Sequence, residues 1–214
     1  MSSVAVIDYG MGNLHSIAKA LQHAHSETAV IVTDHPNKIL DADRVVFPGV
    51  GAIRDCMNAL ADRGLATVLE QVAASKPLLG VCLGMQALLD ESEENNGTAC
   101  LGLIPGQVVR FADGMTDGAG QSLKIPHMGW NRVHQETDHP LWQGIESGSW
   151  FYFIHSYFAR PVNSINVAAT TDYPKPFASA LVRENIFAVQ FHPEKSQEAG
   201  LRLLANFLNW DPGR

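Results

Sequence analysis

Residues 77–89 read Pro-Leu-Leu-Gly-Val-Cys-Leu-Gly-Met-Gln-Ala-Leu-Leu, in which a Gly-x-Cys-x-Gly turn separates two apolar segments. The first segment has the length of a buried strand, and the second, from Met85 onward, has the composition of a helix. A sharp turn from strand to helix, with small residues on both sides of its tip, lifts the tip side chain off the sheet. The stretch therefore predicts a strand–turn–helix unit that presents Cys82.

The rest of the first half repeats this alternation of strand and helix. Apolar runs predict strands over 4–8, 29–33, 44–47 and 77–81, and helical spacing predicts helices over 13–25, from Ile53 to about Leu60, and over 65–74. Pro48-Gly49 is expected to stop the third strand. Apolar strands that alternate with amphipathic helices indicate βαβ units and a parallel sheet.

The second half has a different pattern. Short β-rich runs at 107–111, 150–155, 165–170, 178–182 and 187–191 are separated by turn residues, and a last helix is expected over 197–209. The Gly- and Asp-rich stretch 113–120 is expected to be a mobile loop. The predicted fold is a single α/β domain over residues 1–214: a mostly parallel, flavodoxin-like central sheet flanked by helices, with antiparallel strands added in the C-terminal half.

Composition excludes several classes of function. The chain has 214 residues, 46% of them hydrophobic, and a net charge of −7, which argues against a nucleic-acid binder and against docking on an anionic membrane. Signal-peptide features are missing from the N-terminus, and no run approaches the roughly 18 apolar residues of a membrane span. Three cysteines without a CxxC pair predict neither a disulfide framework nor a zinc site. We expect a cytoplasmic protein without a cofactor or metal.

Cys82 is the candidate nucleophile. At a strand-to-helix turn, the helix dipole and free N–H groups favour a thiolate, and the same amides stabilise an oxyanion. The alternative is a buried structural cysteine, which is the usual state of a free cysteine. We assign that alternative to Cys56 and Cys100, because neither follows a strand in such a turn.

A thiol nucleophile needs a base and an orienting group. Of the nine histidines, three precede proline, and only His192 also follows a strong strand and has a carboxylate two residues on. In an extended segment, residues i and i+2 point to the same side, so Glu194 would hold the imidazole in one tautomer. The alternative is a His-Pro turn with a solvated glutamate.

A third glycine segment, Pro48-Gly-Val-Gly51, follows the strand that ends at Phe47. Active sites of open parallel sheets form at the carboxyl ends of strands, where this loop and the Cys82 turn both lie. The loop is a candidate source of backbone N–H groups for an oxyanion hole. A plain strand-to-helix turn is the alternative.

Taken together, the motifs resemble one enzyme family. They are Asp8–Asn13, Phe47–Gly51, Gly80–Gln86, Ser92–Glu94, Pro126–Asn131, Phe153–Tyr157 and Gln190–Ser196. Over nearly its whole length the chain resembles the class I (triad) glutamine amidotransferases. The first and fifth motifs make it similar, within that family, to the glutaminase subunits of imidazole glycerol phosphate synthases.

The resemblance implies a reaction and a set of roles. Cys82 would attack the glutamine side-chain amide and form a glutamyl thioester, His192 would protonate the departing ammonia and activate water, and Glu194 would orient His192. The Leu83 amide and the Val50-Gly51 peptide would form the oxyanion hole, with a flip of that peptide as a further expectation. The implied glutamine pocket comprises Gly49, Gln86, Glu94, His155, Ser156 and Tyr157.

The resemblance also implies a partner. It is a (β/α)8-barrel cyclase that forms a heterodimer with the glutaminase, receives ammonia through a protected path, and makes imidazole glycerol phosphate and a purine precursor in histidine biosynthesis. Asn13 would couple the two proteins, and Met128, Trp130, Tyr152 and Lys195 match positions at or near the contact. Judged alone, Trp130 and Tyr152 would be ordinary core or surface aromatics, and Lys195 would be a solvated surface charge.

Three other interpretations stay open at the level of sequence. One is a different hydrolase with the same cysteine turn, such as a peptidase or a deglycase-like enzyme. Another is the same glutaminase chemistry feeding a different acceptor, as in sugar amidination. The third is a catalytically inactive regulatory protein on this fold.

Overall fold

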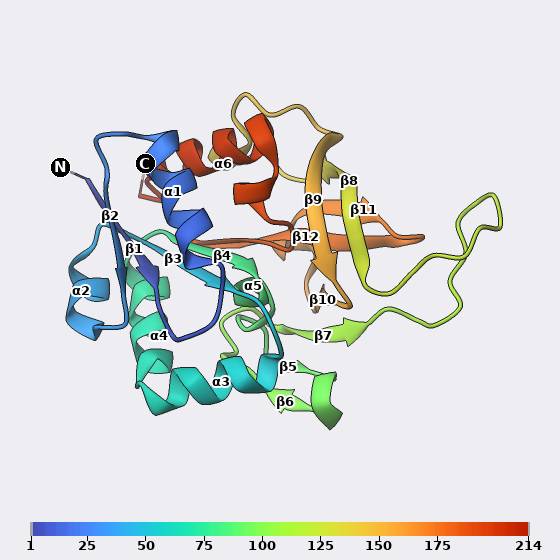
Figure 1. Cartoon of the computed structure of the whole chain (residues 1–214), viewed down its shortest axis with the longest axis horizontal. Coiled ribbons are helices and arrows are strands. Elements are labelled where there is room, and N and C mark those ends of the chain that lie inside the picture. Colours follow the sequence, from blue (N-terminus) through green and yellow to red (C-terminus); the bar gives the residue numbers. More distant parts are fainter. Residues whose placement is uncertain (1, 214) are drawn as a thin grey trace.

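A mixed sheet runs through the molecule in this computed structural model, which describes residues 2–213 (Figure 1). Its parallel part has the order β2-β1-β3-β4-β13, and every neighbouring pair in this part is parallel. The bounds are β1 Ser3–Ile7, β2 Ala29–Thr33, β3 Arg44–Gly49, β4 Leu78–Cys82 and β13 Ile186–Val189. Strands β1 to β4 are the alternating apolar segments expected from the sequence. Strand β13, expected among the antiparallel strands of the C-terminal half, is instead parallel to β4.

Helices cover both faces of the parallel part. Helices α1 (Leu14–Ala24) and α6 (Gln197–Asn209) pack on one face, and α2 (Pro36–Asp41), α3 (Ile53–Asp62) and α4 (Leu65–Ser75) cover the other (Figure 1). Because successive strand side chains point to opposite faces, Val4 and Val6 join the core under α1 and α6, while Ala5 and Ile7 join the core under α3 and α4.

The C-terminal half extends the sheet with antiparallel strands, as predicted. Strand β12 is antiparallel to β13, and β10, β7, β5 and β6 continue the sheet from β12. The neighbouring pairs in this extension are antiparallel except for β7 and β5, which are parallel. Strand β11 pairs with β12 and with β8, and β8 forms a hairpin with β9. The bounds are β5 Glu91–Ser92, β6 Thr98–Ala99, β7 Gly106–Arg110, β8 His127–Gln135, β9 Ser149–His155, β10 Tyr157–Pro161, β11 Val167–Asp172 and β12 Pro176–Arg183. Single 3-10 turns occur at Glu94–Asn96, Pro140–Trp142, Ser164–Asn166 and Pro193–Lys195.

The structure corrects two boundaries near the predicted site. Pro48-Gly49 does not stop β3, which pairs with β4 as far as Gly49 opposite Cys82. Proline is tolerated there because the pairing of β3 with its other neighbour, β1, already ends at Val46, so no ladder bond is lost. The helix expected after Cys82 is a single turn, α5 (Leu83–Gln86), because the chain then tightens into i→i−3 bonds from Leu88 and Leu89.

Sequence patterns did not predict β8, although it carries one of the quoted motifs. Its burial alternates from His127 to Val133, but polar residues occupy several inward positions and Gly129 interrupts the run. Helix α2 and the short strands β5, β6 and β10 were also not predicted.

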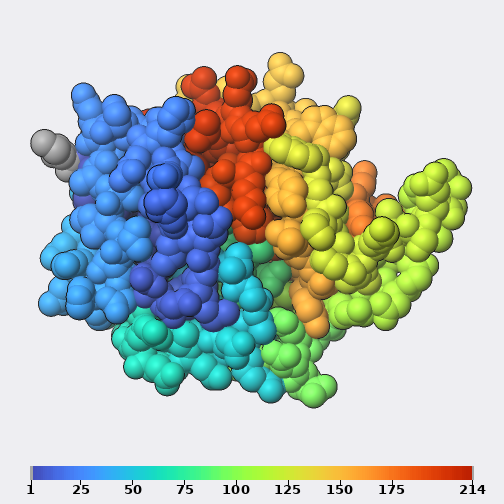
Figure 2. Space-filling view, viewed as in Figure 1, coloured from blue at the N-terminus to red at the C-terminus, as the bar shows by residue number. Residues whose placement is uncertain are grey.

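Residues 112–126 form the long loop expected around 113–120. Apart from an isolated bridge between Thr116 and Ser122, the loop has no strand or helix, and it projects from the body beside β8 (Figures 1 and 2). Its predicted mobility stays a prediction. Within residues 2–213, no helix is both long enough and apolar enough to cross a membrane.

Candidate active site

The turn at Cys82 is a tightly packed strand-to-helix elbow. Cys82 ends β4 with φ of 54°, a conformation that costs a non-glycine residue free energy and is typical of functional turns. A Cβ atom at Gly84 would lie 1.9 Å from the Phe47 carbonyl oxygen of β3, so only glycine fits at that position. The elbow therefore packs directly against the neighbouring strand, and this packing positions the sulfur.

His192 reaches the same sheet edge from the adjacent strand. Strands β4 and β13 pair in parallel, with Val81 opposite Val189, so the residues that follow them meet at their carboxyl ends. The His192 Nδ1 atom lies 2.9 Å from Glu194 Oε1, and both side chains are 3% exposed. The predicted contact is present, but the predicted geometry is wrong: Glu194 belongs to a 3-10 turn, and this turn, rather than an extended segment, brings it back to the imidazole.

The environment of His192 favours the imidazolium. Burial lowers its pKa, but the Cys82 sulfur and the Glu194 carboxylate outweigh that effect and raise the pKa to about 10. No group within residues 2–213 hydrogen-bonds to Nε2, which is buried, although Cys82 is near enough to raise the pKa. Catalytic hydrogen bonds are often long before substrate binds. An imidazolium at this position can give its proton to a leaving group that forms beside Cys82.

A buried pair of amides supports the sulfur from the other side. The Nε2 group of Gln190 donates to Cys82 Sγ at 3.7 Å, and Gln190 Oε1 accepts from Gln86 Nε2 at 3.0 Å. Gln86 Nε2 also donates to the Tyr157 carbonyl at 2.9 Å. Because Gln86 supplies N–H groups to Gln190, the amide of Gln190 must turn its own N–H groups toward the sulfur.

Gln190 was quoted in a motif but given no role at the level of sequence. The available signal was a polar residue directly after the apolar run 186–189, since a buried amide needs partners. Only the structure shows that one of these partners is Cys82.

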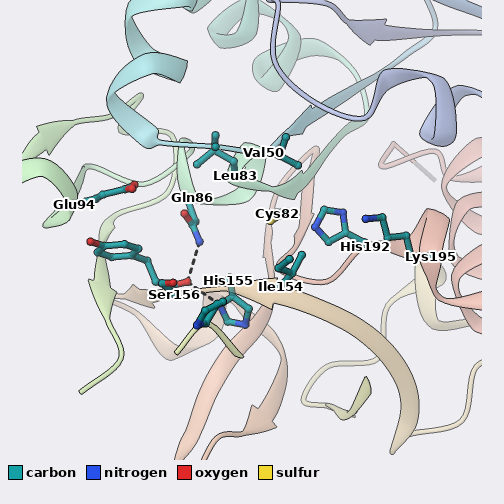
Figure 3. Close-up of a pocket in the computed structure, with 13 residues that line it drawn as sticks. Val50, Cys82, Leu83, Gln86, Glu94, Ile154, His155, Ser156, His192 and Lys195 are labelled. Atoms are coloured by element: carbon teal, nitrogen blue, oxygen red, sulfur yellow. Dashed lines mark hydrogen bonds between the residues drawn. The ribbon is translucent and has the colours of Figure 1, made fainter. Parts of the chain in front are cut away.

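The residues expected to bind glutamine surround one cavity of about 380 Å³ (Figure 3). In Figure 3, Cys82 lies between His192 on one side and Gln86 and Glu94 on the other. Of the expected pocket and catalytic residues, only Gly49 and Glu194 are outside the cavity lining, which is Val50, Gly51, Cys82, Leu83, Gln86, Glu94, Pro126, Ile154, His155, Ser156, Tyr157, His192 and Lys195. Glu94 Oε2 accepts from the Ile53 amide at 3.1 Å. That bond ties the far wall of the cavity to the start of α3.

The Val50-Gly51 peptide lies between β3 and α3 at the mouth of this cavity. Gly51 has φ of 103°, and a Cβ atom there would lie 2.8 Å from Met11 Cε. Below the loop, Tyr9 donates its buried hydroxyl to the Pro48 carbonyl at 2.9 Å, and a Cβ at Gly49 would lie 2.3 Å from that hydroxyl. The loop thus has a fixed base at Gly49, and Gly51 provides the conformational freedom that a peptide flip requires.

The four residues expected near a partner are split between the cavity and the surface. Met128 and Trp130 point outward from β8 and are 59% and 43% exposed. The Trp130 ring contacts Tyr152 edge to face, and Lys195 Nζ lies 5.8 Å from the centre of the Tyr152 ring. Lys195 also lines the cavity, so it lies between the cavity and this aromatic surface. Asn13 lies outside the main cavity, where its side chain accepts from the Ser16 amide and caps α1.

Cys56 and Cys100 lie in surroundings that suppress reactivity. Burial raises the pKa of each thiol to about 12, so both are protonated at neutral pH. Neither lines the cavity. This agrees with the expectation that they are structural.

A family model for class I glutamine amidotransferases matches residues 5–210 of the chain. The chain belongs to the class I glutamine amidotransferase family. A cysteine elbow beside a buried His–Glu pair is the arrangement expected of such an enzyme, and the resemblance seen in the motifs is confirmed at the level of the family.

Individual relatives of this amidotransferase are close. A protein of Methylococcus capsulatus called "Imidazole glycerol phosphate synthase subunit HisH" is 69% identical over 99% of this chain and 98% of its own length. A Nitrosococcus oceani protein of the same name is 58% identical over 99% of both chains.

Solved structures share the fold at low sequence identity. "Structure of PurLQS from Thermotoga maritima" superposes with a TM-score of 0.71 at 20% identity, covering 97% of this chain and 98% of that one. A structure described only as a glutamine amidotransferase gives a TM-score of 0.72 at 16% identity, over 97% of this chain and 99% of that one. These neighbours confirm the predicted fold class.

Proposed function

We propose that this amidotransferase is the glutaminase subunit of an imidazole glycerol phosphate synthase, with Cys82, His192 and Glu194 as its catalytic triad. The observation that carries the proposal is the His192–Glu194 pair, 2.9 Å apart and buried, at the cavity that Cys82 enters from the elbow. The relative at 69% identity over nearly the full length supports the choice of acceptor pathway.

The first half of the reaction forms a thioester. The Cys82 sulfur attacks the side-chain amide carbon of glutamine, a C–S bond forms, and the carbonyl electrons move onto oxygen. The Leu83 amide and the Val50-Gly51 peptide, once its N–H points inward, stabilise this oxyanion. When the intermediate collapses, the C–N bond breaks, and the imidazolium of His192 gives its proton to the departing nitrogen. Ammonia leaves, and a glutamyl thioester stays on Cys82.

The second half returns the enzyme to its starting state. The now neutral His192 takes a proton from water as the water attacks the thioester carbon. The C–S bond then breaks, glutamate forms, and the sulfur leaves as a thiolate beside the re-formed imidazolium. Glu194 keeps the hydrogen on Nδ1, so that Nε2 faces the reacting atoms in both halves.

The cavity supplies groups for both ends of the substrate. Gln86 and Glu94 on one side, with the main chain and side chains of residues 155–157 on the other, would bind the α-amino and α-carboxylate groups of glutamine. The side-chain amide would then extend toward Cys82. We include Gly49 here as the fixed base of the oxyanion loop rather than as a direct contact.

The exposed side of β8 and β9 is the proposed docking surface for a (β/α)8-barrel cyclase. It comprises Met128, Trp130, Tyr152 and Lys195, and it borders the cavity through Lys195. Asn13, which caps α1 and lines a small cavity with His192 and Glu194, is the proposed coupling residue. Delivery of ammonia directly into a partner would prevent its protonation in bulk water. The proposed setting is the cytoplasm.

Replacement of Cys82 by alanine tests the proposal in the reconstituted complex. Glutamine-dependent synthesis of imidazole glycerol phosphate should disappear, whereas synthesis from added ammonium should persist because the cyclase is unchanged. Loss of both activities to the same extent would contradict the division of labour. A strain that lacks this gene should fail to grow without histidine, and the parent gene but not Cys82→Ala should restore growth. This result would distinguish histidine synthesis from amidination of another acceptor.

A further inference from the structure

Two buried histidines face each other behind the cavity. His127 on β8 and His155 on β9 are paired across the hairpin, are 3% and 6% exposed, and have His127 Nδ1 2.9 Å from His155 Nε2. A bond between two imidazoles needs one hydrogen and one lone pair, so the two tautomers are linked. The groups at both ends of the pair decide which ring donates.

The outer end is fixed by Asn131. Its Oδ1 atom accepts from the Arg132 amide at 2.8 Å, which leaves Nδ2 to donate to the Asp172 carbonyl at 2.9 Å. The same Nδ2 lies 3.2 Å from His127 Nε2. Because an amide nitrogen only donates, His127 Nε2 must be the acceptor, and the hydrogen of this ring is on Nδ1.

The inner end gives the same answer independently. His155 Nδ1 lies 2.8 Å from the carbonyl oxygen of Tyr157, which only accepts, so His155 carries its hydrogen on Nδ1 and accepts at Nε2. Hydrogen bonds are therefore donated in one direction along this chain: from Asn131 to His127, from His127 to His155, and from His155 to the Tyr157 carbonyl. No link in this chain lacks a hydrogen, and none has two.

The chain requires both imidazoles to be neutral, and their surroundings favour this state. Burial lowers the pKa of His127 to about 4. Burial also lowers the pKa of His155 to about 3, with a smaller opposing effect of its bond to Tyr157 and further lowering by His127 and His192. The other titratable group against His127 is Tyr173, whose ring stacks on it at 4.0 Å, while Asp172 contributes its backbone carbonyl.

At the Tyr157 carbonyl the chain meets the amide pair that supports Cys82. This oxygen accepts from His155 on one side and from Gln86 Nε2, at 2.9 Å, on the other. An oxygen that accepts from both directions does not pass a proton onward, so the chain holds a position rather than moving a proton. What it holds is the cavity wall formed by Gln86, Ser156 and Tyr157.

We propose that Asn131 and His127, which lie outside the cavity lining, are positioning residues for glutamine: through His155 they hold the Tyr157 carbonyl, and with it Gln86, in the geometry that binds the substrate. The inference rests on the proposed function, because it assumes that glutamine occupies this cavity and reacts at Cys82.

Asn131→Asp replaces the hydrogen-bond donor at the outer end of the chain by an acceptor. A carboxylate has no hydrogen to give, so neutral His127 moves its hydrogen to Nε2 to meet it. Nδ1 then has no hydrogen for His155, and either that link or the link to the Tyr157 carbonyl is lost. Protonation of His127 restores both hydrogens. In this variant the geometry of the cavity wall therefore depends on pH, and the parent geometry returns as the pH falls.

The measurement is covalent labelling of Cys82 in the isolated protein by two reagents. The diazoketone analogue of glutamine must bind in the cavity before it reacts, whereas iodoacetamide reacts with the thiol without binding there. For Asn131→Asp at about pH 8, we expect the apparent inhibition constant of the analogue to rise roughly three- to tenfold, the effect of one lost hydrogen bond. The constant should return to near the parent value at about pH 5.5, because the carboxylate next to His127 raises the pKa of this ring above the low value that burial gives it in the parent. The iodoacetamide rate should match the parent at each pH.

Asn206→Asp is the matched control. Asn206 on α6 also donates to two backbone carbonyls, those of Leu141 and Gln143, but it has no path to the cavity. Its apparent inhibition constant should match the parent at both pH values. An unchanged constant in Asn131→Asp, an equal rise at both pH values, or the same change in Asn206→Asp would overturn the inference.

His127→Gln and His127→Leu provide a second pair that does not depend on Asn131. The glutamine side chain offers one acceptor and one donor and should keep the constant near the parent value, whereas leucine should raise it. Equal constants for the two variants would also overturn the inference. If neither reagent labels Cys82 in the parent, the proposed function itself fails, and that result differs from every outcome above.

Discussion

The elbow region and the β8–β9 hairpin border the same cavity but hold their side chains in different ways. At the elbow, Cys82 is held by backbone packing: Gly84 of α5 lies so near the Phe47 carbonyl that no side chain fits between α5 and β3. At the hairpin, His127 and His155 are held by a directed series of hydrogen bonds. The contrast indicates that changes at the elbow should abolish chemistry or folding, whereas changes at the hairpin should produce graded effects on binding.

His192→Gln tests the elbow side most severely. The amide keeps a polar group of similar reach but neither carries a proton to ammonia nor accepts one from water. Glutamine-dependent activity in the complex should fall by about 10³-fold, within the usual range for loss of a general acid–base. Ammonium-dependent activity measured in the same preparation should stay within twofold of the parent. A glutamine-dependent loss of less than tenfold would exclude His192 as the base.

Gly84→Ala and Gly129→Ala compare packing with backbone conformation directly. A Cβ atom added at Gly84 would lie 1.9 Å from the Phe47 carbonyl oxygen. A Cβ atom added at Gly129 would have no neighbouring atom within 4 Å, so the cost there comes only from the backbone φ of 132°. We expect the free energy of unfolding to fall by about 3 kcal/mol or more for the first variant and by about 1–2 kcal/mol for the second. Urea denaturation at constant pH measures both. A larger loss of stability for Gly129→Ala than for Gly84→Ala would contradict the proposed difference between the elbow and the hairpin.

Glu194→Gln probes the charge that keeps His192 protonated. Burial lowers the pKa of His192, but the Cys82 sulfur and the Glu194 carboxylate together raise it from 6.5 to about 10. Stability from the charged imidazole is therefore present in full below about pH 6.5 and is lost as the pH rises through about 10. Without the carboxylate, the imidazolium should be lost at a lower pH.

The corresponding measurement is the pH profile of Cys82 labelling by the diazoketone. In Glu194→Gln its alkaline limb should move to lower pH, and glutamine turnover near neutral pH should fall by about 10²-fold. A profile that coincides with the parent would show that Glu194 does not act on His192.

Gln190→Leu tests the amide support of the sulfur. Leucine fills a similar volume but donates no N–H to Cys82 Sγ, and it leaves Gln86 Nε2 with only the Tyr157 carbonyl as acceptor. The rate of Cys82 alkylation by iodoacetamide near neutral pH should fall by roughly tenfold, the value of a hydrogen bond to a charged group. Cys56 and Cys100 serve as internal references, and equal changes at all three thiols would indicate general loosening of the fold instead.

Trp130→Ala should have the smallest effect on the isolated chain. The side chain is 43% exposed on β8, so the free energy of unfolding should change by no more than about 0.5 kcal/mol. If β8 docks on the cyclase, the dissociation constant of the complex should rise by about tenfold or more, as for a central interface tryptophan. Ile165→Ala, at an exposed position away from this hairpin, is the control and should leave the constant unchanged. Equal binding by both variants would place the partner elsewhere.

The sequence alone predicted the strands of the parallel half, except for the direction of β13, and it named most residues of the candidate site. Continuous apolar runs predict buried strands such as β4, and a cysteine between glycines at the end of such a run is typical of a sharp strand-to-helix turn. His192 and Glu194 could be chosen because they are close in the chain and follow a strand. In each case the signal is local, so it can be read without knowing which strands become neighbours.

The tertiary structure decided what depends on contacts between distant residues. It shows that a 3-10 turn brings Glu194 to His192, that Gln190 donates to Cys82, and that Asn131 reaches the Tyr157 carbonyl through two histidines. Strand β8 was not predicted because its inward positions are polar, and polar side chains are stable there only when partners from β9 and from the end of β11 satisfy them. A hydrogen bond depends on the position of both groups, and for residues far apart in the chain only the folded arrangement supplies the second.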